Sequence, residues 1–129
     1  MARPGECTEE IIINIEKEAL DRWKTGDTFG FVEIASDDIT YFDPYIECRV
    51  TGLKEFRDFY ASFRYTFSFP RYELVNPNVQ LYGDTAVLTF NFIGYFENGE
   101  KNRWNTTEVY HQVDGQWKLA HSNWSHTKS

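Results

Sequence analysis

The sequence predicts an α+β domain in which helices come first and long antiparallel strands follow. In the first half of the 129 residues, apolar side chains recur at the three- and four-residue spacing of amphipathic helices, whereas from Tyr72 onward they alternate with polar ones at the two-residue spacing of strands. Turn-forming pairs, Asn98-Gly99 and Asp114-Gly115, divide the second half into strands. This order predicts one domain with helices packed on one face of a curved sheet.

The first helix follows a polar lead-in, residues 1–6. Thr8 is its expected N-cap, and the helix runs to about Thr25, where Gly26 supplies the stop. Its apolar side chains recur on one face: Ile12, Ile15, Ala19, Leu20 and Trp23. The polar side chains expected on the opposite side are Glu16, Lys17 and Asp21.

A second, short helix precedes the strand around which the chain is organised. Asp27 is its expected cap, and its apolar members are Phe29, Val32, Ile34 and Ala35. The strand runs from Ser36 to a proline stop at Pro44. Alternation places Ile39, Tyr41 and Asp43 on one face of it, with Thr40 and Phe42 on the other. A carboxylate that shares a face with apolar residues at a strand end is a candidate general base.

One further helix and four further strands complete the prediction. The helix follows Gly52 and presents an apolar face of Leu53, Phe56, Phe59, Tyr60 and Phe63. The strands are expected over residues 74–81, 85–96, 103–113 and 116–126. Pro77 marks the first of these as an edge or bulged strand, and the inward residues of the second are Ala86, Leu88, Phe90 and Phe92.

Composition excludes several classes of function. The formal net charge of −7 argues against binding nucleic acid or an anionic membrane, since both require a basic face. Cys7 and Cys48 have no metal-like spacing, so we expect reduced thiols, no metal site and no cofactor. The first residues lack the apolar region of a signal peptide, which favours a cytoplasmic location.

Several stretches together resemble the nuclear transport factor 2-like superfamily, and more narrowly the SnoaL-like and ketosteroid isomerase-like proteins. They are residues 24–27 (KTGD), 36–44 (SDDITYFDP), 52–56 (GLKEF) and 113–125 (VDGQWKLAHSNWS). Residues 76–79, 83–86 and 109–111, with the final strand, are also similar to the association domain of calcium/calmodulin-dependent protein kinase II.

The resemblance covers about residues 8–126 and implies a single SnoaL-like domain over residues 1–129. The implied fold is a cone, in which three N-terminal helices pack in a strongly bent, mixed but mainly antiparallel sheet. A cavity opens at one end of such a cone. The outer sheet face is used for dimerisation, so a homodimer or higher homo-oligomer is expected.

The resemblance assigns Asp43 to the position of the ketosteroid isomerase general base, which sits in a strand ending Asp-Pro. The family's oxyanion-hole tyrosine falls at Ala19 and its aspartic acid at Val109, so the donors that stabilise the enolate are missing. We therefore do not expect steroid isomerisation. The alternative for Asp43 is an Asx-turn acceptor or a strand-end cap before proline.

Histidines on the last two strands are further candidates. Alternation places His121 and Asn123 on one face with Trp117, Leu119 and Ser125. Related proteins carry a second histidine where this chain has Asn123, which weakens any metal site. His121 is either a hydrogen-bonding partner or proton shuttle for Asp43, or a buried histidine with satisfied hydrogen bonds. On the preceding strand, Thr107, Val109 and His111 share a face, which the family position of Val109 makes the inner one.

Aromatic side chains are expected in the cavity wall, although plain core packing is the alternative. The candidates are Trp23, Tyr41, Phe63, Phe90, Phe92 and Trp104.

Two functions follow from these observations. The first is a small-molecule pocket, in which Asp43 and His121 would carry proton-transfer or water-assisted chemistry of isomerase, cyclase or dehydratase type on an apolar carbonyl ligand. The second is a non-enzymatic oligomerisation module similar to the kinase association domain. Its outward interface anchors would be Tyr95, Tyr110 and Trp124.

Overall fold

The computed structural model describes residues 7–128, so the lead-in predicted over residues 1–6 lies outside the described residues. The described elements are α1 (Thr8–Trp23), α2 (Phe29–Ile34), β1 (Ala35–Phe42), β2 (Val50–Thr51), α3 (Leu53–Ser62), β3 (Arg71–Tyr82), β4 (Thr85–Tyr95), β5 (Lys101–Val113) and β6 (Gln116–His126). The strands form one sheet in the order β2-β1-β6-β5-β4-β3. All neighbours are antiparallel except β1 and β6, which run parallel, so the predicted mixed α+β fold is confirmed.

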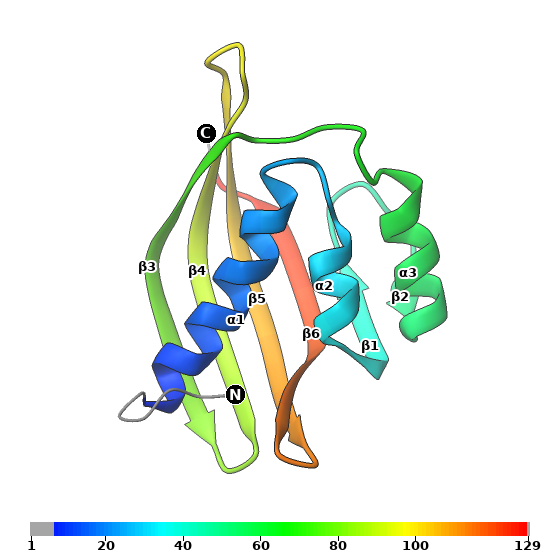
Figure 1. Ribbon diagram of the computed structural model, residues 1–129, viewed down its shortest axis with the longest axis vertical. Coiled ribbons are helices and arrows are strands. Elements are labelled where there is room, and N and C mark those ends of the chain that lie inside the picture. The colour runs from blue at the N-terminus through cyan, green and yellow to red at the C-terminus, as the bar shows by residue number, and fades with distance from the viewer. Residues whose placement is uncertain (1–6, 129) are drawn as a thin grey trace.

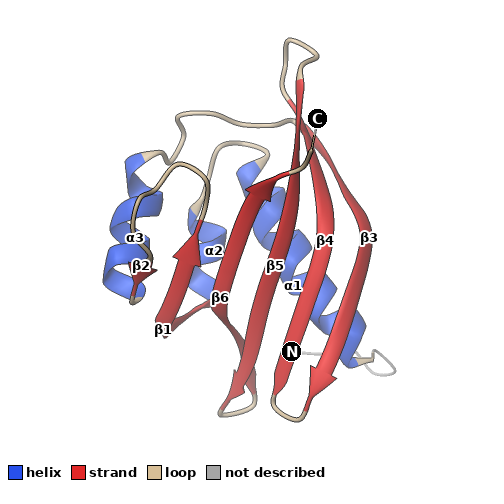
Figure 2. Ribbon diagram, turned by 180° about the vertical axis from the view of Figure 1, so that it is seen from behind, coloured by secondary structure: helices blue, strands red, loops and turns tan. Residues whose placement is uncertain are grey.

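The described helices cover one face of the sheet. Figure 1 shows α1, α2 and α3 in front of the strands, with β3, β4 and β5 curving around α1. Figure 2, from behind, shows the opposite sheet face, which these helices leave uncovered. None of the described helices is long and apolar enough to cross a membrane.

Helix α1 begins and ends one turn or less from its predicted bounds. Cys7 rather than Thr8 is the N-cap, and no side chain caps the helix, so the predicted role of Thr8 was wrong. Gly26 terminates it with φ +94°, a backbone conformation that favours glycine. A Cβ at Gly26 would also lie 3.0 Å from Tyr65 Cα, and the Tyr65 amide donates to the Gly26 carbonyl (2.8 Å). This glycine therefore joins the end of α1 to the segment after α3.

Asp27 connects the helices, although the N-cap of α2 is Thr28 and not Asp27 as predicted. One carboxylate oxygen accepts the Phe29 amide (3.1 Å) at the start of α2 and Arg64 Nε (2.9 Å) from beyond α3. The other accepts Arg22 Nη2 of α1 (2.8 Å). Partial burial raises the pKa of Asp27, but the hydrogen bonds from Arg22, Phe29 and Arg64 outweigh it, so the pKa is lowered.

The strand faces predicted for β1 and β4 are confirmed, and so is the edge or bulged character predicted for β3. Ile39 and Tyr41 are buried on the concave face of β1, and the four predicted inward residues of β4 are buried. Strand β3 is an edge strand, and its pairing with β4 shifts between Val75 and Asn78, around Pro77.

The faces predicted for β5 and β6 are wrong, for two reasons. On β5 the inner face carries the buried residues Thr106, Glu108 and Tyr110. Thr107, Val109 and His111 therefore point outward. On β6, Leu119 pairs with Tyr110 while His121 pairs with Val109, which leaves Ala120 as the extra residue of a β-bulge. The bulge reverses the alternation, so Leu119 points inward whereas His121 and Asn123 point outward.

The inner face of β5 and the bulge in β6 also place two of the predicted interface anchors inside the fold, so these two predictions were wrong. Tyr110 is fully buried, and Trp124 packs inside against Phe90 and Phe92, with ring centroids 6.0 and 5.3 Å apart. Tyr95 stays at the sheet surface, where its hydroxyl donates to Glu73 (2.7 Å).

Candidate functional site

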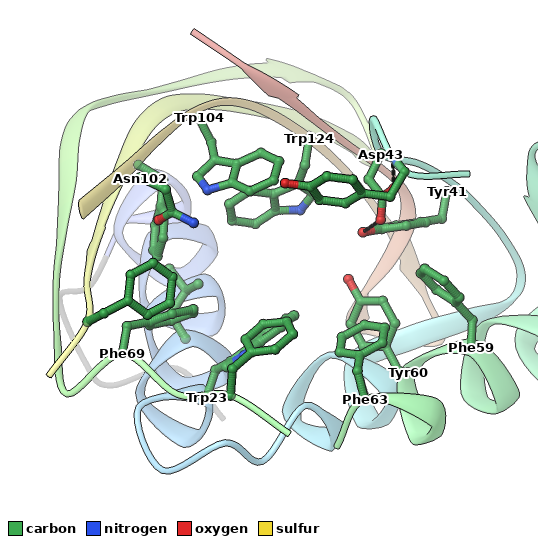
Figure 3. A pocket seen from close by; sticks show the side chains of 15 residues that line it. Trp23, Tyr41, Asp43, Phe59, Tyr60, Phe63, Phe69, Asn102, Trp104 and Trp124 are labelled. Carbon is green, nitrogen blue, oxygen red and sulfur yellow. Dashed lines mark hydrogen bonds between the residues drawn. The ribbon is translucent and has the colours of Figure 1, made fainter. Parts of the chain in front are cut away.

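A cavity of about 570 Å³ lies between the helices and one end of the sheet. Figure 3 shows aromatic side chains around an open space, with Asp43 and Tyr41 at its edge. Its aromatic lining residues are Trp23, Tyr41, Tyr45, Phe59, Tyr60, Phe63, Phe67, Phe69, Phe92, Phe96, Trp104 and Trp124. The remaining lining residues are Leu20, Asp43 and Asn102. The wall therefore offers a large apolar surface with a few polar groups.

Asp43 lies directly after β1, where Pro44 ends the strand. Its Oδ2 accepts the Tyr41 hydroxyl (2.8 Å), and its Oδ1 accepts the Tyr45 amide (2.8 Å). The second bond closes an Asx-type turn, so the alternative considered for this residue is present in the structure. Because each carboxylate oxygen can accept two hydrogen bonds, both oxygens retain acceptor capacity toward the cavity.

Two tyrosine hydroxyls extend this hydrogen bonding into the core. Tyr41 on β1 and Tyr60 on α3 are buried, and their hydroxyls point toward one another beside the cavity (Figure 3). Burial raises the pKa of Tyr41 well above its usual value, and the charges of Tyr60 and Asp43 add to the effect. Burial raises the pKa of Tyr60 similarly, although its hydrogen bond with Tyr41 opposes this. Both side chains are therefore neutral hydroxyl groups at physiological pH.

Two residues of the opposite wall, Trp23 and Asn102, carry unpaired polar atoms. The indole Nε1 of Trp23 and the Oδ1 of Asn102 are buried without a hydrogen-bond partner among the described residues. Asn102 lies over Gly94, where a Cβ would be only 2.8 Å from Asn102 Oδ1. A glycine at position 94 therefore leaves room for the amide. Buried polar groups without a hydrogen-bond partner destabilise the folded state unless a ligand or water supplies the missing hydrogen bond.

The mouth of the cavity is partly covered by Tyr45, which lies in the segment after β1. Its ring packs edge-on against Trp104, with centroids 6.0 Å apart, and its hydroxyl lies 3.0 Å from His126 Nε2. His126 in turn packs on Trp104, with centroids 4.2 Å apart. Tyr45 is nevertheless 73% exposed, so its ring lies between the cavity and solvent.

A buried carboxyl pair lies in the core outside the cavity lining. Glu16 of α1 and Glu108 of β5 are both fully buried. Glu16 Oε1 accepts the Tyr110 hydroxyl (2.6 Å), and the Glu16 and Glu108 carboxyl groups lie close enough to hydrogen-bond when one of them carries a proton. Burial raises the pKa of Glu16 to about 7, while its hydrogen bonds with Glu108 and Tyr110 oppose the rise. Burial and the charge of Glu16 raise the pKa of Glu108 well above its ordinary value.

Of the candidate residues predicted from the sequence, six line the cavity. They are Asp43, Trp23, Tyr41, Phe63, Phe92 and Trp104. Phe90 is buried beside the cavity, against Trp124, but does not line it.

His121, Thr107, His111 and Asn123 lie on the outer face of the sheet. The Nδ1 of His121 lies 2.7 Å from Thr40 Oγ1, and its ring meets Phe42 edge-on. Since Thr40 points away from Asp43, the expectation that His121 partners Asp43 across the cavity was wrong. Burial lowers the pKa of His121, although its hydrogen bond with Thr40 opposes this. His111 pairs instead with Thr85 Oγ1 (3.2 Å).

Several residues beside the cavity were not predicted from the sequence to lie there. Tyr60 was expected only in an apolar helix face, yet its hydroxyl lies beside the cavity. Trp124 was expected outside because the bulge at Ala120 leaves no mark in the alternation pattern. Asn102 lies near a hairpin end and carries no signal beyond its place next to Trp104. Among residues 7–128, no group of three or more His, Cys, Asp or Glu side chains is arranged to hold a metal ion.

Comparisons with known proteins identify the family of the chain. The model of the SnoaL-like domain matches residues 17–120. A ketosteroid isomerase-like protein of Parabacteroides distasonis has 36% sequence identity and a TM-score of 0.89, with 99% of this chain and 96% of that chain covered. A comparison with curated proteins finds no match.

More distant structures share the fold. A nuclear transport factor 2-like protein of unknown function from Pseudomonas putida has 21% identity and a TM-score of 0.83, over 94% of this chain and 87% of that one. The calcium/calmodulin-dependent protein kinase II hub of S. rosetta has 21% identity and a TM-score of 0.72, over 98% of this chain and all of the hub chain. Together with the family match and the bent mixed sheet, these likenesses show that the chain belongs to the SnoaL-like family and has the nuclear transport factor 2-like fold.

Proposed function

We propose that the protein binds an apolar small molecule in the cavity and that Asp43 is the principal polar anchor for it. The observation that carries this proposal is the aromatic cavity of about 570 Å³ with one carboxylate at its edge. Small-molecule sites in proteins typically enclose roughly 300–1,000 Å³ and combine apolar walls with a few polar groups. This cavity has both properties.

The composition of the wall favours an apolar ligand over water. Aromatic rings offer water few hydrogen bonds, so water in the cavity is weakly held and its displacement by apolar surface is favourable. The few polar atoms, on Asp43, Tyr60 and Asn102, can orient a ligand that carries matching groups. They come from different elements, which fixes their spacing.

Turnover of a carbonyl ligand stays a prediction. Asp43 would act as the base, and the Tyr60 hydroxyl, which lies beside the cavity, would polarise a carbonyl oxygen as a hydrogen-bond donor. His121 takes no part, because it lies on the outer sheet face. The geometry supports binding more directly than catalysis, since Asp43 already accepts two hydrogen bonds that hold it in place.

A cavity-filling variant tests the binding proposal. Asn102 points into the cavity (Figure 3), so Asn102→Trp should block it, whereas Arg103→Trp places the same side chain on the opposite, exposed face of β5. Nile red, an uncharged apolar dye, should bind the wild-type protein and Arg103→Trp alike, and Asn102→Trp at least tenfold more weakly. Equal dye binding by all three proteins would place the dye elsewhere and contradict the proposal.

A native mass spectrum of the purified protein extends the same test to the natural ligand. Under gentle conditions, a bound molecule adds its mass to the protein peak, and denaturation should release it. Asn102→Trp should carry no such molecule. Addition of a candidate carbonyl compound to wild-type protein and Asp43→Asn would then test turnover, which should be lost in the variant if Asp43 is the base.

A second candidate function is assembly into a homo-oligomer through the outer sheet face. Figure 2 shows this face free of the described helices. Its central strands carry mostly uncharged, often β-branched side chains, including Val87, Thr89, Ile93, Thr107 and Val109. Phe42 on β1 is 41% exposed on the same face. Analytical ultracentrifugation should then give a dimer or larger species, and Val109→Arg should reduce it to a monomer.

A further inference from the structure

We propose that the ligand of the cavity is a cation, namely an apolar amine or quaternary ammonium compound whose charged nitrogen pairs with Asp43 and lies against the aromatic wall. This inference rests on the proposed binding function and specifies its ligand. It is carried by the charges of the lining, the free acceptor capacity of Asp43 and the aromatic rings around it.

The lining carries one charge, and that charge is negative. Among the described residues, those that line the cavity include no lysine, arginine or histidine, so none of them offers Asp43 a cationic partner inside the cavity. The two hydrogen bonds that Asp43 accepts come from uncharged donors, Tyr41 and the Tyr45 amide. A formal net charge of −7 adds an attractive field for cations and a repulsive one for anions. An anionic ligand would therefore meet a carboxylate with nothing to offset it.

Aromatic rings supply the second half of a cation site. The face of an aromatic ring attracts a cation placed within about 6 Å, most strongly for tryptophan. Trp23, Trp104 and Trp124 all line this cavity, and Figure 3 shows them around the same open space as Asp43. A quaternary or tertiary ammonium group is only weakly hydrated, so it can leave water for such a site. Aromatic cages that recognise ammonium ligands in other proteins use the same physics.

Probes that differ only in charge can test the inference. Benzyltrimethylammonium and neopentylbenzene have the same shape but differ by a nitrogen cation in place of a carbon, and 4-tert-butylbenzoate supplies an anion of similar size. Binding can be followed by isothermal titration and by the fluorescence of the lining tryptophans. We expect benzyltrimethylammonium to bind about tenfold more tightly than neopentylbenzene, and the benzoate to bind most weakly.

A matched pair of variants locates the charge. Asp43→Asn keeps the carbonyl that accepts the Tyr45 amide, and it should weaken binding of the ammonium probe about tenfold while leaving neopentylbenzene unchanged. Asp37→Asn makes the same change of charge at an exposed position of β1 and should alter neither. Circular dichroism establishes that both variants are folded. In the wild-type protein, added sodium chloride should weaken binding of the ammonium probe but not of neopentylbenzene.

The outcomes separate this inference from the binding function. Equal or tighter binding of neopentylbenzene, or a loss of ammonium affinity no greater in Asp43→Asn than in Asp37→Asn, would overturn the cation inference and leave the apolar pocket intact. Tightest binding by the benzoate would overturn it as well. Failure of all three probes and of Nile red to bind would overturn both proposals.

Discussion

Replacement of Glu16 by glutamine should change how the stability of the protein depends on pH. Burial raises the pKa of Glu16 from 4.5 to about 7, so the folded state holds a proton that the unfolded state releases between these pH values. The free energy of unfolding is therefore higher below pH 4.5 than at neutral pH, and this difference is lost as the pH rises to 7. Glu16→Gln removes the titrating group while keeping its shape and an acceptor for Tyr110.

The size of the effect follows from the pKa difference. Each pH unit corresponds to about 1.4 kcal/mol, so the Glu16 carboxyl costs the wild-type protein about 3 kcal/mol between pH 4.5 and pH 8. The raised pKa of Glu108 acts in the same direction, and burial, its largest cause, remains in the variant, whereas the contribution of the Glu16 charge is lost. The free energy of unfolding should therefore fall with pH in both proteins, but by about 3 kcal/mol less in Glu16→Gln than in the wild type.

Urea unfolding at pH 5, 6, 7 and 8, followed by tryptophan fluorescence, measures this difference. Glu18→Gln is the control, because this substitution removes the same charge from an exposed position on the same helix. Its unfolding free energy should follow the wild-type profile. If Glu16→Gln also follows the wild-type profile, the pair does not hold a proton in the folded state and the reasoning is refuted.

Three further substitutions give expected changes in urea unfolding. Asp27→Asn should lower the free energy of unfolding by about 1–2 kcal/mol at pH 7, because it weakens hydrogen bonds to two arginines. This difference should shrink toward pH 3, because the pKa of Asp27 is lowered in the folded state and its stabilising contribution is lost as the pH falls. The control Asp58→Asn, at an exposed ion pair, should leave the free energy of unfolding almost unchanged. Gly94→Ala should cost about 1–3 kcal/mol and weaken dye binding, because its Cβ would meet Asn102 at 2.8 Å; an unchanged midpoint would show that the amide moves freely. Tyr110→Phe should cost about 1–3 kcal/mol, because a buried carboxyl oxygen loses its donor.

The sequence pattern predicted those elements whose local alternation agrees with their tertiary environment. On β1 and β4, apolar residues occupy every second position, and these are the residues that face the core. The face of β1 that carries Ile39 and Tyr41 also brings Asp43 to the cavity, so the residue that we propose as the polar anchor was already a candidate from the sequence. The aromatic wall was found in part for the same reason.

The pattern failed where a polar residue lies inside or where the backbone departs from regular pairing. Glu16 was expected in solvent because glutamate usually is, and only its contact with Tyr110, distant in sequence, accounts for its burial. The bulge at Ala120 reverses the faces of the rest of β6, and no turn residue marks it. The inner face of β5 was assigned from the family position of Val109, which is offset by one residue from the inward Glu108.

The hydrogen bond between Tyr110 and Glu16 joins residues 94 positions apart, and the contact between Thr40 and His121 spans 81. Helix α1 can therefore complete the burial of its inner face only after β5 has been synthesised. Until then, the part of α1 around Glu16 lacks its packing partner on β5. Such non-local contacts slow folding because a long loop must close before they form. A ribosome that pauses before residue 116 should hold a chain that is sensitive to protease, and release of β6 should make it resistant.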